Sequence, residues 1–306
     1  MKYNLSFISD VSSNHCNNLQ IAKDLIYESK SIGCQHAKFQ YWETENFINK
    51  KNFKKIGNLS HQAKWKNGVY GTYKKYQLKE DWIPILYDEC KKVDIDFMLS
   101  CYELSKIDDF DKYVTYWKIG SGDINYWPIL EKIASKKKPI ILAIGAATYK
   151  DIKETLEYLT VQPDFILKDL TLLHCNTVYD GNDMDNLKYM NLSFFETLKL
   201  WQNQYDIQYG LSDHARMTLP IISAVSLGAT WFERHLKLSD NNSPDSKFSM
   251  NPKQFKGMIE AAKLVYESLG DGIKKIEENE RETRIVQRRS NITWDRPDIE
   301  CWSKNK

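Results

Sequence analysis

Two short apolar segments of the chain carry pairs of polar residues that could do chemistry. In the first, Ser212 stands two residues before His214, and in the second, Glu233 stands two residues before His235. Because side chains two residues apart on a strand share a face, each segment directs its pair to one side. A helical pattern over residues 218–227 separates the segments, so the two strands would lie side by side, and their neutral imidazoles would supply half of a metal site. Histidines that only satisfy core hydrogen bonds are the alternative interpretation.

The composition excludes several classes of protein. The 306 residues include 43 Lys and Arg against 41 Asp and Glu, so the formal charge is +2. A charge this even indicates neither a nucleic acid nor a membrane surface as partner. The six cysteines show no metal or disulfide spacing, which is typical of a reducing compartment, and we expect a cytoplasmic protein. The longest apolar run, residues 139–147, is too short to cross a bilayer.

Short apolar strands alternate with longer helical patterns along the chain. The strand-like runs cover residues 6–9, 37–40, 96–100, 116–119, 139–144, 171–174, 207–210 and 230–234. The helical patterns cover residues 18–32, 79–93, 104–113, 127–135, 150–159, 192–204, 218–227 and 252–269. Eight strands, each followed by a helix, predict an α/β fold that closes into a (β/α)8 TIM barrel rather than an open sheet.

Two segments exceed what this repeating unit needs. Residues 41–78, after the second strand, are rich in aromatic residues and lysine, and we expect a long loop over the barrel mouth. Residues 271–306 contain a charged helical pattern and a polar end. The sequence therefore predicts a barrel domain over residues 1–270, followed by a C-terminal helix and polar tail over residues 271–306.

Two lysines lie inside strands that should be buried. Lys38 is flanked by Ala37 and Phe39, and Lys118 is flanked by Trp117 and Ile119. A buried ammonium group is costly unless an anion meets it, and catalytic groups of TIM barrels gather where the strands end. The pattern predicts a site for a small phosphate or carboxylate ligand beside the histidine pair. Hydroxyl and amide groups that follow the strands, at Ser121, Gly122 and Ser212, would supplement it.

These motifs, taken in order, resemble those of the sialic acid synthases. The matching segments include Lys-Phe-Gln at 38–40, Lys-Ile-Gly-Ser-Gly-Asp at 118–123, Gly-Leu-Ser-Asp-His at 210–214 and Glu-Arg-His at 233–235. Further matches are found at residues 10–15, 97–103, 145–148, 172–175, 243–249 and 288–290. The family condenses phosphoenolpyruvate with an N-acylated hexosamine to give a nonulosonic acid. The resemblance therefore implies phosphoenolpyruvate and an aldose acceptor as partners, and a sialic-acid-like 2-keto-3-deoxy sugar acid and phosphate as products.

The resemblance also assigns roles to individual residues. His214 and His235 match the family's metal-binding histidines, which implies a divalent cation, manganese in preference to magnesium or cobalt. The residues that match phosphoenolpyruvate contacts are Lys38, Lys118, Ser121 and Ser212, and those expected near the sugar or another part of the substrate are Gln40, Thr177 and Tyr179. The carboxylates implied in catalysis are Asp123, Asp10 and Asp245, of which Asp10 and Asp245 would lie near a metal-bound water.

The chain departs from the family pattern at several places. Asp10 stands where the family has glutamate, and Ala143 stands where a serine usually contacts the phosphate. Family members continue after residues 288–290 into an antifreeze-like domain, which we do not expect in residues 271–306. The resemblance then implies either a homodimer or an antifreeze-like domain supplied by a separate protein. The basic second loop, with Lys66 aligned near the sugar, leaves room for a phosphorylated acceptor.

Two other functions stay open on the sequence alone. Lys118 or Lys38 could form a Schiff base with a keto acid, as in an aldolase. The departures at Asp10 and Ala143 and the missing domain would also suit a catalytically degenerate barrel that acts as a sugar-binding or scaffolding subunit. The retained histidines and lysines argue against that alternative, because a barrel that needed only to fold would place apolar residues there.

Overall fold

The computed structural model describes residues 4–48, 62, 65–179 and 181–289. By its internal contacts the chain divides into two compact units, Met1–Glu267 and Ser268–Lys306. The first unit holds all the strands of the described residues. Each unit is described by itself below.

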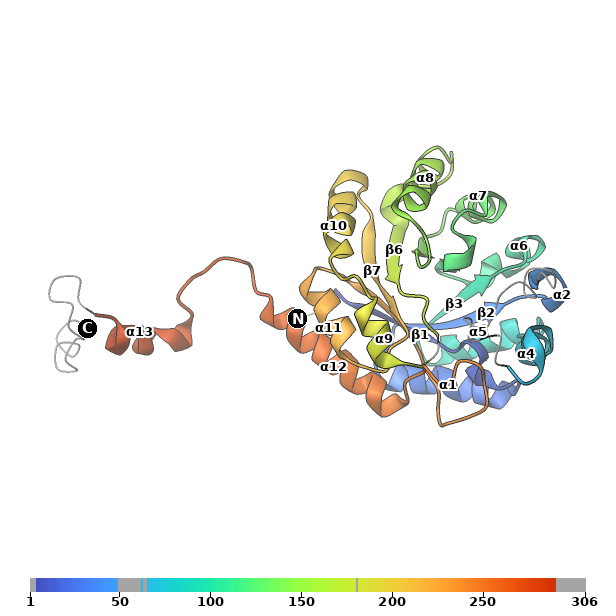
Figure 1. Cartoon of the computed structure of the whole chain (residues 1–306), viewed down its shortest axis with the longest axis horizontal. Coiled ribbons are helices and arrows are strands. Elements are labelled where there is room, and N and C mark those ends of the chain that lie inside the picture. The colour runs from blue at the N-terminus through green and yellow to red at the C-terminus, as the bar shows by residue number, and fades with distance from the viewer. Residues whose placement is uncertain (1–3, 49–61, 63–64, 180, 290–306) are drawn as a thin grey trace. The chain divides into compact units, whose positions relative to one another are not determined.

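The first unit is a closed barrel of parallel strands, as the sequence predicted (Figure 1). The strands are β1 (Ser6–Asp10), β2 (His36–Tyr41), β3 (Asp96–Cys101), β4 (Trp117–Ile119), β5 (Ile140–Ala143), β6 (Leu170–Cys175), β7 (Gln208–Asp213) and β8 (Trp231–His235). They follow one another around the barrel in chain order, and β8 pairs with β1 to close it. Closure leaves no free sheet edge, which is why every strand can be buried on both faces.

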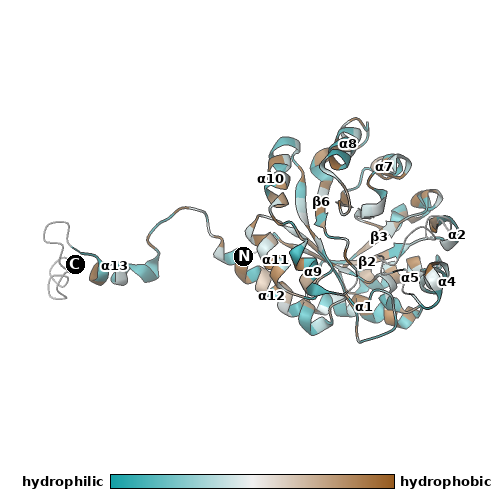
Figure 2. Cartoon of the chain, viewed as in Figure 1, coloured by the Kyte–Doolittle hydropathy of each residue, from teal (hydrophilic) through white to brown (hydrophobic). Residues whose placement is uncertain are grey.

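Helices cover the outside of the barrel. The described helices of this unit are α1 (Leu19–Ser31), α2 (Thr44–Phe47), α4 (Gly68–Tyr76), α5 (Trp82–Lys92), α6 (Ile107–Phe110), α7 (Trp127–Ala134), α8 (Tyr149–Thr160), α9 (Asp183–Lys188), α10 (Phe194–Tyr205), α11 (Leu219–Ser226) and α12 (Pro252–Ser268). Figure 2 shows apolar and polar residues alternating around outer helices such as α1 and α12. This periodicity buries one stripe of each helix against the strands.

Local signals explain where several helices begin. The Asn18 side chain accepts the backbone N–H groups of Gln20 and Ile21 and caps α1. Thr148 and Asp151 form a reciprocal capping box at the start of α8. Such caps satisfy N–H groups that the first helical turn leaves without partners. Helices α7 and α11 instead begin with proline near their first position, where no N–H is needed.

Three parts of the predicted pattern differ in the structure. The helix predicted over 104–113 is broken into a 3₁₀ turn, the short α6 and a second 3₁₀ turn. The connection over 41–78 was predicted as a loop, but it contains α2 and α4. Gly68 and Gly71 lower the helical propensity of α4, which is held by burial of Thr72 and Tyr76 one turn apart. The six-residue α9 was not predicted, because so short a segment shows little periodicity.

The interior of the barrel is filled in its lower part by a separate apolar cluster. This cluster consists of Ile8, Met98, Ile141, Ala143, Leu173 and Trp231. Ile8 stands two residues before Asp10, and Trp231 two residues before Glu233, so the same strand faces are apolar at one level and polar at the next. The cluster fills the lower part of the barrel, and the polar residues of the same strand faces lie above it, at the mouth.

The second unit is small and polar. It contains a 3₁₀ turn (Glu278–Glu280) and the helix α13 (Arg281–Gln287), neither of which has a buried residue. Exposed ion pairs join Lys275 to Asp271 and Arg281 to Glu278. Across the described residues, no helix is both long enough and apolar enough to span a membrane.

Replacing Gly210 by alanine tests the close approach of β7 and β8. A Cβ atom at Gly210 would lie 1.9 Å from the carbonyl oxygen of Trp231, so the strands would have to move apart. We expect Gly210→Ala to lower the free energy of unfolding by about 1–3 kcal/mol, measured by denaturant titration. Gly257 in α12 is the control, because nothing lies within 4 Å of its Cβ position. Gly257→Ala should be neutral or slightly stabilising, and an equal loss in both variants would contradict this account.

Candidate active site

All twelve predicted site residues line one cavity at the carboxyl ends of the strands. This cavity has a volume of about 660 Å³. The twelve are Asp10, Lys38, Gln40, Lys118, Ser121, Asp123, Thr177, Tyr179, Ser212, His214, His235 and Asp245. The register of the barrel explains the convergence, because Asp10 of β1 stands opposite Lys38 of β2 on one side and His235 of β8 on the other. Side chains that the sequence separates by up to 235 positions therefore meet at one level of the barrel.

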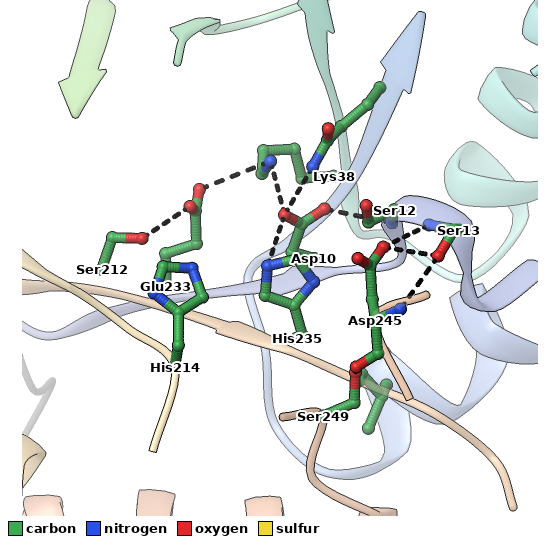
Figure 3. A network of polar contacts seen from close by, with 12 residues as sticks. Asp10, Ser12, Ser13, Lys38, Ser212, His214, Glu233, His235, Asp245 and Ser249 are labelled. Carbon is green, nitrogen blue, oxygen red and sulfur yellow. Dashed lines mark hydrogen bonds and ion pairs between the residues drawn. The ribbon is translucent and has the colours of Figure 1, made fainter. Parts of the chain in front are cut away.

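The centre of the cavity is a cluster of two lysines and two carboxylates, of which Figure 3 shows Lys38, Asp10 and Glu233. Lys38 Nζ lies 2.7 Å from Asp10 Oδ2 and 3.8 Å from Glu233 Oε2. Lys118 Nζ lies 3.6 Å from Glu233 Oε1, which also accepts a hydrogen bond of 2.9 Å from Ser212. None of the four charged side chains is more than 5% exposed. In so little water, each charge is tolerated only because an opposite charge lies beside it.

Burial and pairing shift the pKa values of this cluster in different directions. Burial alone would lower the pKa of Lys38, but Asp10 and Glu233 outweigh it and raise the pKa above its ordinary value. The pKa of Lys118 is lowered, because burial and the nearby charge of Lys38 outweigh the attraction of Glu233. Burial would raise the pKa of Glu233, yet Lys118 and Lys38 hold it down at about 2. Glu233 is therefore an anion at neutral pH.

The two histidines face each other across a short gap. Their ring centroids are 5.4 Å apart, and His214 Nδ1 lies 2.8 Å from the carbonyl oxygen of Asn176. A carbonyl can only accept, so this contact places the proton of His214 on Nδ1 and leaves the lone pair of Nε2 available. Burial, together with His235, lowers the pKa of His214 to about 3, which keeps the ring neutral as a metal ligand must be.

His235 is the second buried imidazole of the pair. Its Nε2 lies 3.4 Å from Asp10 Oδ2, and its buried Nδ1 has no hydrogen-bond partner in the described part of the chain. Within the same part, no group of three or more His, Cys, Asp or Glu side chains is arranged to hold a metal. His214 and His235 would hold a cation here. Its other coordination positions would be open to oxygen ligands, as in catalytic metal sites. The ring of Phe248 packs against both imidazoles and fixes their planes.

Two aspartates of the site are oriented by the turn that follows β1. Asp10 Oδ1 accepts the backbone N–H of Ser12, while its Oδ2 accepts a hydrogen bond of 2.9 Å from Gln40. Asp245 accepts both the N–H and the hydroxyl of Ser13, at 2.9 and 2.6 Å. Burial would raise the pKa of Asp245, but His235, Ser12 and Ser13 stabilise the anion, and the pKa is lowered. Despite being one methylene shorter than glutamate, Asp10 still reaches the centre of the site.

Asp123 stands apart from this network on the other wall. Burial raises its pKa to about 6, and its carboxylate makes no hydrogen bond or ion pair within the described residues. Ser121, on the same turn, accepts the N–H of Gly145 at 2.9 Å. A Cβ at Gly145 would lie 2.5 Å from Thr177 Cγ2, so glycine is what lets this wall close tightly. Asp123 is therefore a carboxylate whose protonation can change near neutral pH.

Several residues that line the cavity were not predicted from the sequence. Glu233 was seen only as the partner of His235 on its strand, although it is the anion that holds both lysines. Its place two residues before a histidine, on the same strand face, was the available signal. Trp42 and Phe47, two aromatic residues of the second connection that pack on each other, also line the cavity and were not assigned to the site. Lys66, by contrast, was aligned near the sugar, but it is exposed and does not line the cavity.

The variant Lys38→Met tests whether the charged cluster stabilises the barrel. It would leave two buried carboxylates to share one ammonium group, and we expect the free energy of unfolding to fall by about 3–5 kcal/mol. Adding Asp10→Asn removes one of the anions and should recover part of the loss. Lys74→Met is the control, because Lys74 pairs with Glu45 at an exposed position and should cost less than about 1 kcal/mol. Denaturant titration measures all four proteins, and equal effects of Lys38→Met and Lys74→Met would rule out the buried cluster as a stabilising element.

The chain that carries this site is similar to a known protein family and to several of its members. The model of the NeuB family matches residues 25–274. A Campylobacter jejuni protein named N,N'-diacetyllegionaminic acid synthase is 32% identical over 92% of this chain and 83% of its own length. An uncharacterized protein of Methanocaldococcus jannaschii is 33% identical over 92% of this chain and 77% of its own length.

A solved structure shows the same fold. The crystal structure of N-acetylneuraminic acid synthetase from Leptospira borgpetersenii, in complex with citrate, superposes with a TM-score of 0.77 at 23% identity, over 91% of this chain and 90% of that one. The match to the family model and the 32% identity to the Campylobacter jejuni protein confirm the family predicted from the order of the motifs. The chain belongs to the NeuB family and is an enzyme of the sialic acid synthase type.

Proposed function

We propose that this protein condenses phosphoenolpyruvate with an aldose to give a sialic-acid-like 2-keto-3-deoxy sugar acid and phosphate, with the help of a divalent cation. The observation that supports the proposal is the placement of two buried lysines beside two buried histidines in one cavity. Anion binding and carbonyl activation are the two requirements of such a condensation. The names of the relatives, which include sialic, legionaminic and pseudaminic acid synthases, support the same reaction class.

The lysines would bind the phosphate and carboxylate of phosphoenolpyruvate. Lys38 and Lys118 are already paired with Asp10 and Glu233, so the incoming anion competes with these carboxylates for the ammonium groups. Ser212 and Ser121 line the same part of the cavity and can donate further hydrogen bonds. Ala143 offers no hydroxyl where the family places serine. The lysines and the remaining hydrogen-bond donors would therefore contribute a larger share of the affinity for phosphoenolpyruvate.

The two histidines would hold the cation. When bound, a divalent ion such as Mn²⁺ acts as a Lewis acid that polarises the aldehyde of the open-chain acceptor. Asn176 keeps His214 in the tautomer that can bind, and Phe248 keeps both rings in place. Asp10 and Asp245 lie beside His235 and can orient a water molecule there through their carboxylate oxygens.

The overall reaction consumes one water molecule for each pair of substrates. C3 of phosphoenolpyruvate forms a bond to the aldehyde carbon, water adds at C2, and phosphate leaves as its C–O bond breaks. The water that adds at C2 must lose a proton, and the aldehyde oxygen must gain one. Asp123, with a pKa of about 6, is the carboxyl group of this wall that can take up and return a proton near neutral pH.

Lys118 supports a second candidate function. Its lowered pKa makes it the better of the two lysines for attack on a keto acid, as a Schiff-base aldolase requires. Borohydride would trap such an intermediate as a stable adduct of Lys118 with pyruvate. The condensation mechanism forms no such bond, so a metal-dependent reaction without trapping excludes the aldolase.

Phosphate release from phosphoenolpyruvate, measured with Mn²⁺ and a panel of N-acylated hexosamines, plain aldoses and phosphorylated aldoses, tests the proposed function. We expect release with at least one acceptor, and loss of that release on addition of a chelator. His214→Ala and His235→Ala should each lower Mn²⁺ affinity at least about 10-fold, read from the signal of free Mn²⁺ in electron paramagnetic resonance. His174→Gln is the control, because His174 contacts the Met190 carbonyl and does not line the cavity. Unchanged Mn²⁺ binding in both alanine variants would exclude the histidine site.

The pH dependence of turnover tests the role of Asp123. Its raised pKa means that it is protonated below about pH 6 and ionised above it. If the carboxylate is the working form, kcat at saturating phosphoenolpyruvate should fall as the pH drops through about 6. Asp123→Asn should lower kcat by about 100-fold or more and remove this limb from the residual rate. Persistence of the same limb in the variant would assign the titration to another group.

A further inference from the structure

The loop that follows β8 returns to the end of its own strand. It spans residues 236–250, and its last residue, Met250, donates its N–H to the carbonyl oxygen of His235 at 2.9 Å. We call this segment the β8 loop. Two of its residues line the cavity beside the histidine pair, because Phe248 packs on both imidazoles and the charge of His235 acts on Asp245. The path of the β8 loop therefore decides where these two side chains lie.

Asn14, in the turn that follows β1, binds the β8 loop through its side chain. The residue is only 1% exposed. Its Nδ2 donates to the Leu236 carbonyl oxygen at 2.9 Å and to Ser249 Oγ at 2.8 Å, while its Oδ1 accepts the hydroxyl of Ser243 at 2.7 Å. These contacts need two donors on one nitrogen and an acceptor beside it, which a carboxylate or an aliphatic side chain cannot supply. The roles assigned so far leave this buried amide unused.

The hydrogen bonds of Asn14 continue to Asp245. The hydroxyl of Ser249, which accepts from Asn14, donates to the backbone carbonyl oxygen of Asp245 at 2.6 Å. Ser13, the neighbour of Asn14, holds the carboxylate of the same aspartate through its N–H and its hydroxyl (Figure 3). Two consecutive residues of one turn thus hold Asp245 at its backbone and at its carboxylate.

The backbone of this turn is strained. Ser12, Cys16 and Asn17 have positive φ angles of 40°, 51° and 54°, a region that residues other than glycine seldom occupy. Such a conformation persists only where the surrounding contacts hold it. The bonds from Asn14 to the β8 loop are contacts of this kind, so the turn and the loop keep each other in place.

We propose that Asn14 is a positioning residue of the active site, which holds the β8 loop so that Asp245 and Phe248 lie against the histidine pair. The proposal rests on the proposed function, in which that pair holds the cation. Asn14 is not among the described residues that line the cavity, so it acts on the site only through the loop. Lys38 and Lys118 are paired with carboxylates of other strands and stay in place without it. Loss of the Asn14 hydrogen bonds therefore weakens the cation site and spares the binding of phosphoenolpyruvate.

The variant Asn14→Leu removes all three hydrogen bonds with little change in volume. Mn²⁺ affinity, read from the signal of free Mn²⁺ in electron paramagnetic resonance, should fall by about 10-fold, and kcat should fall with it while KM for phosphoenolpyruvate is unchanged. Amide hydrogen exchange reports the loop directly, because the Ser13 N–H is donated to Asp245. Its exchange rate should rise at least about 10-fold more than that of Ile144, whose N–H lies between β5 and β6. Wild-type Mn²⁺ affinity and Ser13 exchange in folded Asn14→Leu overturn the proposal.

Two further proteins keep the test decisive. Ser243→Ala combined with Ser249→Ala cuts the hydrogen bonds from the side of the loop and leaves Asn14 in place, so it should give the same pattern even if Asn14→Leu folds poorly. Ser29→Ala is the control, because Ser29 is buried in α1, bonds to the Leu25 carbonyl oxygen at 2.6 Å and does not line the cavity.

The outcomes separate this proposal from the proposed function. An equal loss of Mn²⁺ affinity in Ser29→Ala would assign the effect to general destabilisation and overturn the role of Asn14. If the unaltered protein neither binds Mn²⁺ nor releases phosphate, the proposed function fails. Exchange at Ser13 would then still decide whether Asn14 holds the β8 loop.

Discussion

The arrangement of the site depends on the burial of four charges at the mouth of the barrel. Lys38, Lys118, Asp10 and Glu233 come from four different strands, and each is almost inaccessible to water. An isolated buried ion costs several kcal/mol, so the barrel can fold only with these side chains in contact. The pairing therefore fixes the strand ends relative to one another. The same pairing keeps each ammonium group at a fixed place in the cavity, because a carboxylate lies beside it.

The sequence was sufficient for the barrel and for many of the residues that line the cavity, for a physical reason. Functional side chains of this fold lie at the ends of buried strands, where a polar residue interrupts an apolar run and stands out. Lys38, Lys118, His214 and His235 were found in this way. Glu233 was not assigned a role, because its partners lie on β2, β4 and β7, and only closure of the barrel brings these strands around it. A pattern along one strand cannot show which residues face it across the barrel.

The second connection was the least predictable part of the chain. Residues 41–78 were expected to form a loop, whereas the described residues include α2 and α4, whose rings form a wall of the cavity. Glycines inside α4 weaken the local helical signal, and contacts with the barrel supply the stability instead. Lys66, which was aligned near the sugar, is exposed and does not line the cavity, because its position depends on the packing of α4, which local sequence does not encode.

The cavity is thus built from two kinds of structure with different constraints. The strand ends hold the lysines, carboxylates and histidines, and each of these is tied to its neighbours by register and by ion pairs. A change there disturbs the barrel itself, so the positions of these lysines, carboxylates and histidines are fixed by the fold. The segments after β2, β3 and β4 hold Phe47, Tyr102 and Asp123, which have far fewer such ties. These segments can therefore change without disturbing the strand ends, because the two sets share a cavity but little of the structural support.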